Sequence, residues 1–116
     1  MKRQQAEKRG RRGEAIAAWW LRLHGWRIVG ERVKTPRGEV DLVVRRGKAL
    51  AFVEVKARAT AEQLDHSIDA YRLRRVIAAA EALVERYGKG AEEIRVDVIL
   101  VAPWTMPRHL VNVGQI

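Results

Sequence analysis

Hydrophobic positions follow a helical period at the start of the chain and a strand period after it. Apolar residues recur at helical spacing over residues 13–24, which predicts a first helix that ends at Gly25. Stretches rich in β-branched and aromatic residues follow, at about 26–33, 40–44 and 50–56. We expect an irregularity at Gly30 in the first of them. The last two predict a β-hairpin, because a short polar turn at 45–48 separates them.

The second half of the chain repeats this change of period. An apolar stripe over about 69–87 predicts a long helix that ends at Gly88. A near-continuous apolar stretch at 94–101 predicts a central strand, and 110–113 predicts a short final one. The order α-β-β-β-α-β-β predicts an α/β domain with a mixed sheet flanked by helices. In this sheet the strand after the long helix should run parallel to its partner.

Composition narrows the class of protein. The 116 residues suit one domain, and no apolar stretch reaches the ~18 residues that a membrane span needs. The sequence has no cysteine, which excludes disulfides, cysteine-ligated zinc, iron–sulfur clusters and thiol catalysis. The basic start leads into no apolar core, so it does not have the pattern of a secretion signal. We therefore expect a soluble, cytoplasmic protein with no membrane partner.

The charge is strongly positive and unevenly distributed. Lysine and arginine number 23 against 14 aspartates and glutamates, which gives a net charge of +9 and a pI near 10.8. Residues 1–12 hold six of the basic side chains and show no apolar periodicity. We therefore expect a basic N-terminal arm at 1–12, followed by a single domain at 13–116. Such a charge favours nucleic acid as the partner, with plain solubility as the alternative explanation.

Charged residues cluster on the expected hairpin. Glu54 and Lys56 share one face of their strand, because side chains alternate between the two faces. If Val44 pairs with Ala49 across the turn, Asp41 becomes the diagonal neighbour of Glu54 on that same face. The two carboxylates would then lie within reach of one ion.

The same register places Glu39 opposite Glu54. Two facing carboxylates repel each other, so a structure that keeps such a cluster needs compensation. Mg²⁺ or Mn²⁺ would supply it, with Asp41 and Glu54 as ligands and Lys56 beside the attacked phosphate. The alternative is a solvated strand face on which Glu54 and Lys56 simply pair their charges. Leu50 and Phe52 lie on that face, and they argue against full solvation.

Asp41, followed by Glu54 and Lys56 after a short hairpin, resembles the PD-(D/E)xK motif of the restriction-endonuclease-like nucleases. From residue 10 onward the chain resembles the YraN family of uncharacterised bacterial proteins, which is similar to archaeal Holliday-junction resolvases. The stretches that carry this resemblance are 13–17, 38–42, 52–58, 74–80 and 95–98.

The resemblance implies a restriction-endonuclease-like fold and a metal-dependent endonuclease acting on DNA, with branched DNA such as Holliday junctions as a candidate substrate. It implies that Asp41 and Glu54 are metal ligands, that Lys56 is the catalytic lysine and that Glu14 is an acid near the metal. Arg72 stands where we expect the family's lysine. Arginine keeps a phosphate contact but cannot transfer a proton.

Basic side chains would hold the nucleic-acid backbone, namely those of Arg9, Arg11, Arg12, Arg58, Arg72, Arg74 and Arg75. A second class of function stays open, in which the chain binds nucleic acid without cutting it and the acids are structural. A third is a basic assembly protein that dimerises through whichever of Trp19 and Trp20 is exposed. A homodimer would also suit a two-fold junction substrate.

Two further acids have alternative roles. Glu39 is an outer acid of the site, the partner of Arg58 or, as a third alternative, a direct metal ligand. Asp97 interrupts an apolar strand, so it is either a buried structural group bonded to Arg95 or to the backbone, or a member of a wider site.

Overall fold

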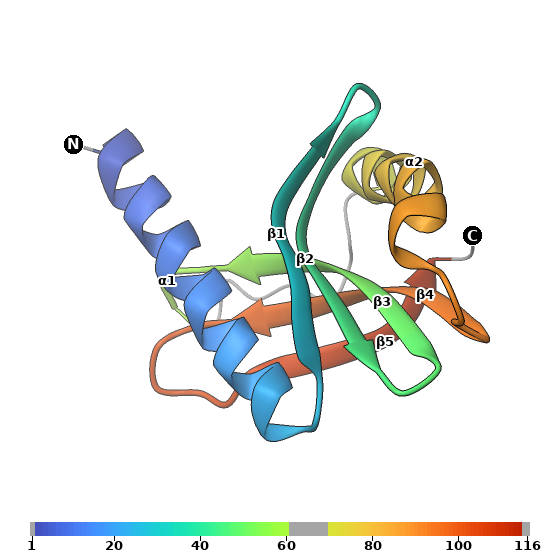
Figure 1. Ribbon diagram of the computed structural model, residues 1–116. Helices are drawn as coiled ribbons and strands as arrows, with labels where there is room; N and C mark the ends of the chain where they lie inside the picture. The colour runs from blue at the N-terminus through green and yellow to red at the C-terminus, as the bar shows by residue number, and fades with distance from the viewer. Residues whose placement is uncertain (1, 61–69, 115–116) are drawn as a thin grey trace.

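The computed structural model describes residues 2–60 and 70–114, and Figure 1 shows their arrangement. The elements are α1 (Lys2–Leu23), β1 (Arg27–Thr35), β2 (Gly38–Arg46), β3 (Ala49–Ala57), α2 (Ala70–Tyr87), β4 (Glu93–Val101) and β5 (Arg108–Gly114). The strands form one sheet in the order β1-β2-β3-β4-β5. The expected α/β class and element order are therefore confirmed. Among the described helices, none is long and apolar enough to cross a membrane.

Helix α1 begins at Lys2, so the expected start of the first helix at residue 13 is wrong. Lysine, arginine, glutamine and glutamate all favour helices, and they continue the helix where no apolar stripe signals it. The lysine and arginine side chains between residues 8 and 12 are exposed. Figure 1 shows this N-terminal part of α1 extending past the sheet. The division of the chain into a basic segment and a domain stays a prediction.

The β2–β3 hairpin has a different register from the expected one. Val44 pairs with Ala51, and Arg46 pairs with Ala49, so the turn is shorter than we expected. Gly47 has a φ of 60°, which suits the tight two-residue turns that connect antiparallel strands. The shift is by two residues, and side chains alternate with a period of two. The faces of the expected acidic cluster are therefore preserved.

The rest of the sheet follows the expected topology. β3 and β4 are parallel, with Phe52 opposite Val96, and α2 forms the crossover between them. β4 and β5 are antiparallel. The register of β1 against β2 shifts between Ile28 and Gly30, so the predicted irregularity at Gly30 is confirmed.

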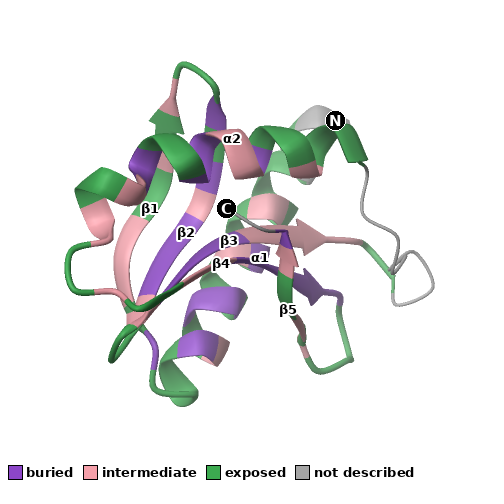
Figure 2. Cartoon of the chain, turned by 90° about the vertical axis from the view of Figure 1, so that its right-hand side faces the viewer, coloured by how far each residue is buried: buried purple, intermediate pink, exposed green. Residues whose placement is uncertain are grey.

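Each face of the sheet is covered by one helix (Figure 2). On one face, Ala17 and Leu21 of α1 join an apolar cluster with strand residues such as Val53. On the other face, Val76 of α2 joins a second cluster with residues such as Phe52. Because α1 buries one stripe only, Trp19 is exposed, which confirms that one tryptophan of the adjacent pair faces outward.

Two glycines allow the helices to approach the ends of the strands. A Cβ atom on Gly13 would lie 2.7 Å from the Cβ atom of Ala57, at the end of β3. A Cβ atom on Gly38 would lie 2.7 Å from the backbone oxygen of Arg75 in α2. Neither distance is tolerable, so both contacts require glycine. They bring α1 to the end of β3, and α2 to the start of β2.

Candidate functional site

The central feature of the site is a pair of carboxyl groups, Asp41 on β2 and Glu54 on β3. Asp41 accepts a hydrogen bond from the backbone N–H of Val55 at 2.8 Å. The Glu54 carboxyl also donates a hydrogen bond to Asp41. The regular β2–β3 pairing extends to Leu42 opposite Val53, and beyond it the Asp41 side chain bonds the β3 backbone. The structure thus brings together the two acids that the hairpin pattern predicted as neighbours.

Burial and like charge both disfavour the ionised form of this pair. Burial, followed by the charge of Asp41, raises the pKa of Glu54 to about 8, although the charge of Arg72 opposes the shift. Burial also raises the pKa of Asp41, and the charges of Glu14 and Glu39 add to that rise. At neutral pH the pair therefore holds a proton between its two carboxyl groups.

Besides the proton, the guanidinium group of Arg72 supplies a second positive charge to the acid pair. Its Nη2 atom lies 2.7 Å from Oε1 of Glu54, and 13% of the Glu54 side chain is exposed against 64% of that of Arg72. One proton and one guanidinium thus balance two carboxylates. A divalent cation carries the same total charge and takes carboxylate oxygens as ligands. The donor set therefore fits such an ion.

The ligand set would be small. Within the described ranges, no three histidine, aspartate or glutamate side chains are grouped closely enough to hold a metal ion. If only Asp41 and Glu54 bind the ion, water and phosphate would fill most of its coordination positions. Mg²⁺ in proteins is usually coordinated in this way.

Lys56 lines a cavity of about 230 Å³ next to the acid pair, together with Glu54, Arg58 and Arg72. Glu54 and Lys56 reach the same cavity because they are two residues apart on β3. The predicted catalytic lysine therefore lies beside the glutamate, in a cavity that also contains two arginines.

A second hollow, of about 300 Å³, lies over the acid pair and is lined by the first turns of α2. Its lining residues are Glu39, Asp41, Glu54, Tyr71, Arg72, Arg75 and Val76. Among the ion pairs of the described residues, none joins Glu39 to Arg58. The alternative of Glu39 as an outer acid therefore agrees better with its position.

Glu14 lies on the α1 side of the same region. Its Oε1 atom is 2.7 Å from Nε of Arg32, and both residues line a separate hollow that also contains Glu31. Glu14 is close enough for its charge to raise the pKa of Asp41, but it does not line the hollow of the acid pair. The structure thus places Glu14 near the pair and holds it through Arg32.

Sequence reasoning missed Arg32. It is a β1 residue with a φ of 48°, a backbone conformation that is uncommon outside glycine. It also lies close enough to Asp41 and Glu39 to feel their charges. The nearby irregularity at Gly30 was the only signal of unusual geometry in this strand.

Comparison with known proteins gives the family. Residues 13–101 match the "Uncharacterised protein family UPF0102". The chain belongs to this family. A UPF0102 protein of Rhizorhabdus wittichii is 68% identical over 97% of this chain and 95% of its own length. One of Sphingopyxis alaskensis is 62% identical over 99% of both chains.

A solved structure shares the fold. It is described as Archaeoglobus fulgidus Hjc, a Holliday junction resolvase from an archaeal hyperthermophile. The TM-score is 0.60 at 23% sequence identity, over 86% of this chain and 73% of that chain. The expected resemblance to the resolvase-like fold is confirmed at the level of architecture.

Arginines of this UPF0102 chain surround the acid pair on several sides. Arg9 and Arg12 of α1 share a small hollow with Arg58 at the end of β3, and Arg58 also lines the cavity of Lys56. Arg72 and Arg75 line the hollow over the acid pair. Hollows that share residues therefore connect the basic part of α1 to the start of α2.

Two of the arginines that were predicted to hold the nucleic-acid backbone lie outside this chain of hollows. Arg11 lines the hollow of Glu14. Arg74 is exposed on α2 and lines none of the hollows described above. Their role in binding nucleic acid stays a prediction.

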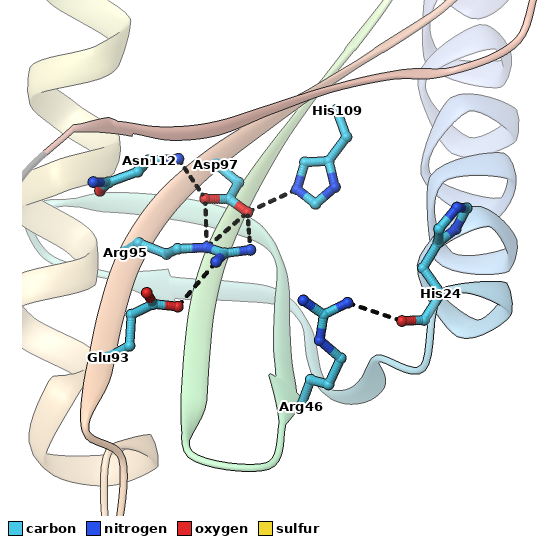
Figure 3. Close-up of polar contacts among 7 residues, drawn as sticks. All are labelled: His24, Arg46, Glu93, Arg95, Asp97, His109 and Asn112. Atoms are coloured by element: carbon cyan, nitrogen blue, oxygen red, sulfur yellow. Dashed lines mark hydrogen bonds and ion pairs between the residues drawn. The ribbon is translucent and has the colours of Figure 1, made fainter.

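A second acidic centre lies on β4 (Figure 3). Asp97 is completely buried. Its carboxylate accepts hydrogen bonds from His109 Nε2 at 2.7 Å, from the backbone N–H of Asn112 at 2.9 Å and from Arg95 at 3.2 Å. Burial acts to raise the pKa of Asp97, but these bonds outweigh it and leave the pKa lowered. The structural alternative for Asp97 is therefore supported, and His109 is a partner that sequence reasoning missed.

Proposed function

We propose that this UPF0102 chain is a metal-dependent nuclease that hydrolyses phosphodiester bonds in DNA, with branched DNA such as Holliday junctions among its substrates. The observation that carries the proposal is the half-buried pair of carboxyl groups, Asp41 and Glu54, in hollows that Lys56 and Arg72 also line. Strongly perturbed acids in a hollow are characteristic of functional sites. The fold shared with a Holliday junction resolvase adds support, because it gives a precedent for this chemistry on this architecture.

Asp41 and Glu54 would hold Mg²⁺ or Mn²⁺. When bound, such an ion supplies Lewis-acid activation of water and neutralises charge on the phosphate. Lys56 lines the cavity beside Glu54, where its ammonium group would bind a phosphate oxygen and stabilise negative charge as it develops. Glu14, held by Arg32, adds negative charge near Asp41 and so favours a cation there.

Arg72 would change partners as the site fills. Without a divalent ion its guanidinium neutralises Glu54. Once an ion supplies that charge, the exposed Arg72 side chain is able to contact a phosphate instead. Arginine stays protonated at any working pH, so its contribution is positional and electrostatic.

The arginines around the site would hold the phosphate backbone, so binding should weaken steeply with salt. The basic part of α1 carries Arg9, Arg11 and Arg12 as a projecting helix that a duplex could lie against. A homodimer would place two such sites on a two-fold junction, and we include it in the proposal.

The test is a cleavage panel of linear, flapped and four-way junction DNA with Mg²⁺ and Mn²⁺. Glu54→Gln and Lys56→Ala should each lower the cleavage rate by about 100-fold or more, the size of effect that loss of one transition-state contact produces. Glu85→Gln and Lys48→Ala change exposed residues of the same types outside the site, and should leave the rate unchanged. Unaltered metal-dependent cleavage in both site variants would show the assignment to be wrong.

One observation favours a second candidate, a nucleic-acid-binding protein that does not cut. The acid pair is already balanced in charge by its shared proton and by Arg72. Calorimetry separates the two candidates. A nuclease should bind Mg²⁺ or Mn²⁺ at a site that Glu54→Gln removes, whereas a binding protein should show no such site and still bind DNA in a salt-dependent way.

A further inference from the structure

Tyr71 is an aromatic residue in an unusual place for one. It lies in the first turn of α2, 59% exposed, and it lines the same hollow as Asp41 and Glu54. A ring that is this exposed contributes little to a hydrophobic core. Its position at the acid pair suggests contact with whatever occupies the hollow.

The surroundings of Tyr71 are cationic. Arg75 lies one helical turn further along α2, and its guanidinium carbon is 6.0 Å from the centre of the Tyr71 ring. Arg72 and Arg75 line the hollow with the ring. Proteins bind unpaired nucleotides on aromatic rings near cationic side chains, with the ring stacking on a base and the cations holding phosphates.

We propose that Tyr71 stacks on an unpaired base next to the phosphate that the acid pair acts on, and so makes the site prefer nucleic acid with unpaired bases. The inference rests on the proposed function in taking nucleic acid as the ligand. In an intact duplex both faces of each base are already stacked. A protein ring therefore gains contact only where a flap, a junction or a distortion exposes a base.

The experiment compares two DNAs of one sequence, a flap with 2-aminopurine at the branch and the matching intact duplex. Binding is measured without divalent ions, and the fluorescence of 2-aminopurine reports stacking. Tyr71→Ala should weaken flap binding by roughly 5- to 100-fold and abolish the fluorescence quench, with little effect on the duplex. Tyr71→Phe keeps the ring and should behave as the wild type.

Trp104→Ala is the matched control. Trp104 is fully exposed, yet it lines none of the hollows around the acid pair, so its loss should leave flap binding unchanged. Thermal melting of each variant checks that the fold is intact.

Three results would overturn the inference. Equal flap binding by Tyr71→Ala and the wild type would remove any role for the ring. An equal loss in Tyr71→Phe would assign the effect to the hydroxyl group. A wild type that binds no DNA would end this inference together with the proposed function. A wild type that binds but does not cleave would contradict the nuclease proposal alone, because the stacking assay needs no cleavage.

Discussion

Two acidic centres lie on neighbouring strands of one sheet, one completely buried and one half-buried, and they differ in what surrounds them. Asp97 on β4 is opposite Val53, the residue before Glu54 on β3. Because neighbours along a strand point to opposite faces, Asp97 and Glu54 lie on different sides of the sheet. Burial acts on both in the same direction, yet the pKa of Asp97 is lowered and that of Glu54 is raised to about 8.

The neighbours account for the difference. Asp97 receives hydrogen bonds from a guanidinium group, an imidazole ring and a backbone N–H, and Arg95 also packs against the buried ring of Trp26 at 5.0 Å. Glu54 faces another carboxyl group, with one exposed arginine to compensate. This comparison distinguishes an acid that stabilises the fold from acids that, under the proposed function, hold a cation.

The largest expected effect concerns Asp97. Asp97→Ala should lower the free energy of unfolding by about 3–5 kcal/mol, because it leaves the largely buried Arg95 guanidinium without its main partner. Urea unfolding followed by circular dichroism measures the change. A loss under about 1 kcal/mol would show that Asp97 does not stabilise the fold, and the contrast between the two centres would fail.

Most of the fold, but not all of it, could be predicted from the sequence. The order of helices and strands could be predicted from the spacing of apolar residues, because each helix buries one stripe and each strand at least one face. The start of α1 could not be predicted in this way, since none of the side chains whose burial is described between residues 4 and 12 is buried. The hairpin register was wrong because Arg45 and Arg46 continue β2 as polar strand residues, where polarity suggested a turn.

At the site, the two acids could be predicted from the sequence, but the side chains that bind more distant acids could not. Asp41 and Glu54 could be placed on one face from alternation alone, and that inference survives a two-residue error in register. Arg32 and His109 were missed because each acts on an acid far away in sequence, Glu14 and Asp97 respectively. Pairings of that kind depend on the positions of β1 and β5 at the two edges of the sheet, and no local pattern encodes them.

Stability against pH should show opposite signs for the two centres in the metal-free protein. The pKa of Glu54 is raised from 4.5 to about 8. Its contribution to stability is therefore fully present below pH 4.5 and is lost as the pH rises toward 8, by up to ~1.4 kcal/mol per pH unit. The pKa of Asp97 is lowered from 3.8, so its contribution is present above that pH and is lost in more acidic solution.

Chemical unfolding at a series of pH values measures both limbs, with Glu54→Gln and Asp97→Asn as the matched variants. Glu54→Gln should flatten the decline between pH 4.5 and 8 relative to the wild type. Asp97→Asn should instead flatten the acidic limb. The opposite assignment of the two variants would contradict the charge balance described for these sites.

The smallest expected effect is that of Glu54→Gln on stability at pH 7. A glutamine can still donate a hydrogen bond to Asp41, as the protonated Glu54 carboxyl does. The ion pair with Arg72 is lost, but that side chain is 64% exposed, and exposed pairs contribute roughly 0–1 kcal/mol.

We therefore expect a change of less than about 1 kcal/mol in the free energy of unfolding, in either direction, together with complete loss of Mg²⁺ or Mn²⁺ binding by calorimetry. The two measurements together separate stability from ligand binding. A loss near that of Asp97→Ala would mean that the acid pair supports the fold as Asp97 does. The raised pKa values would then belong to a pair of acids that stabilises the fold, and the proposal that the pair serves to bind a cation would fail.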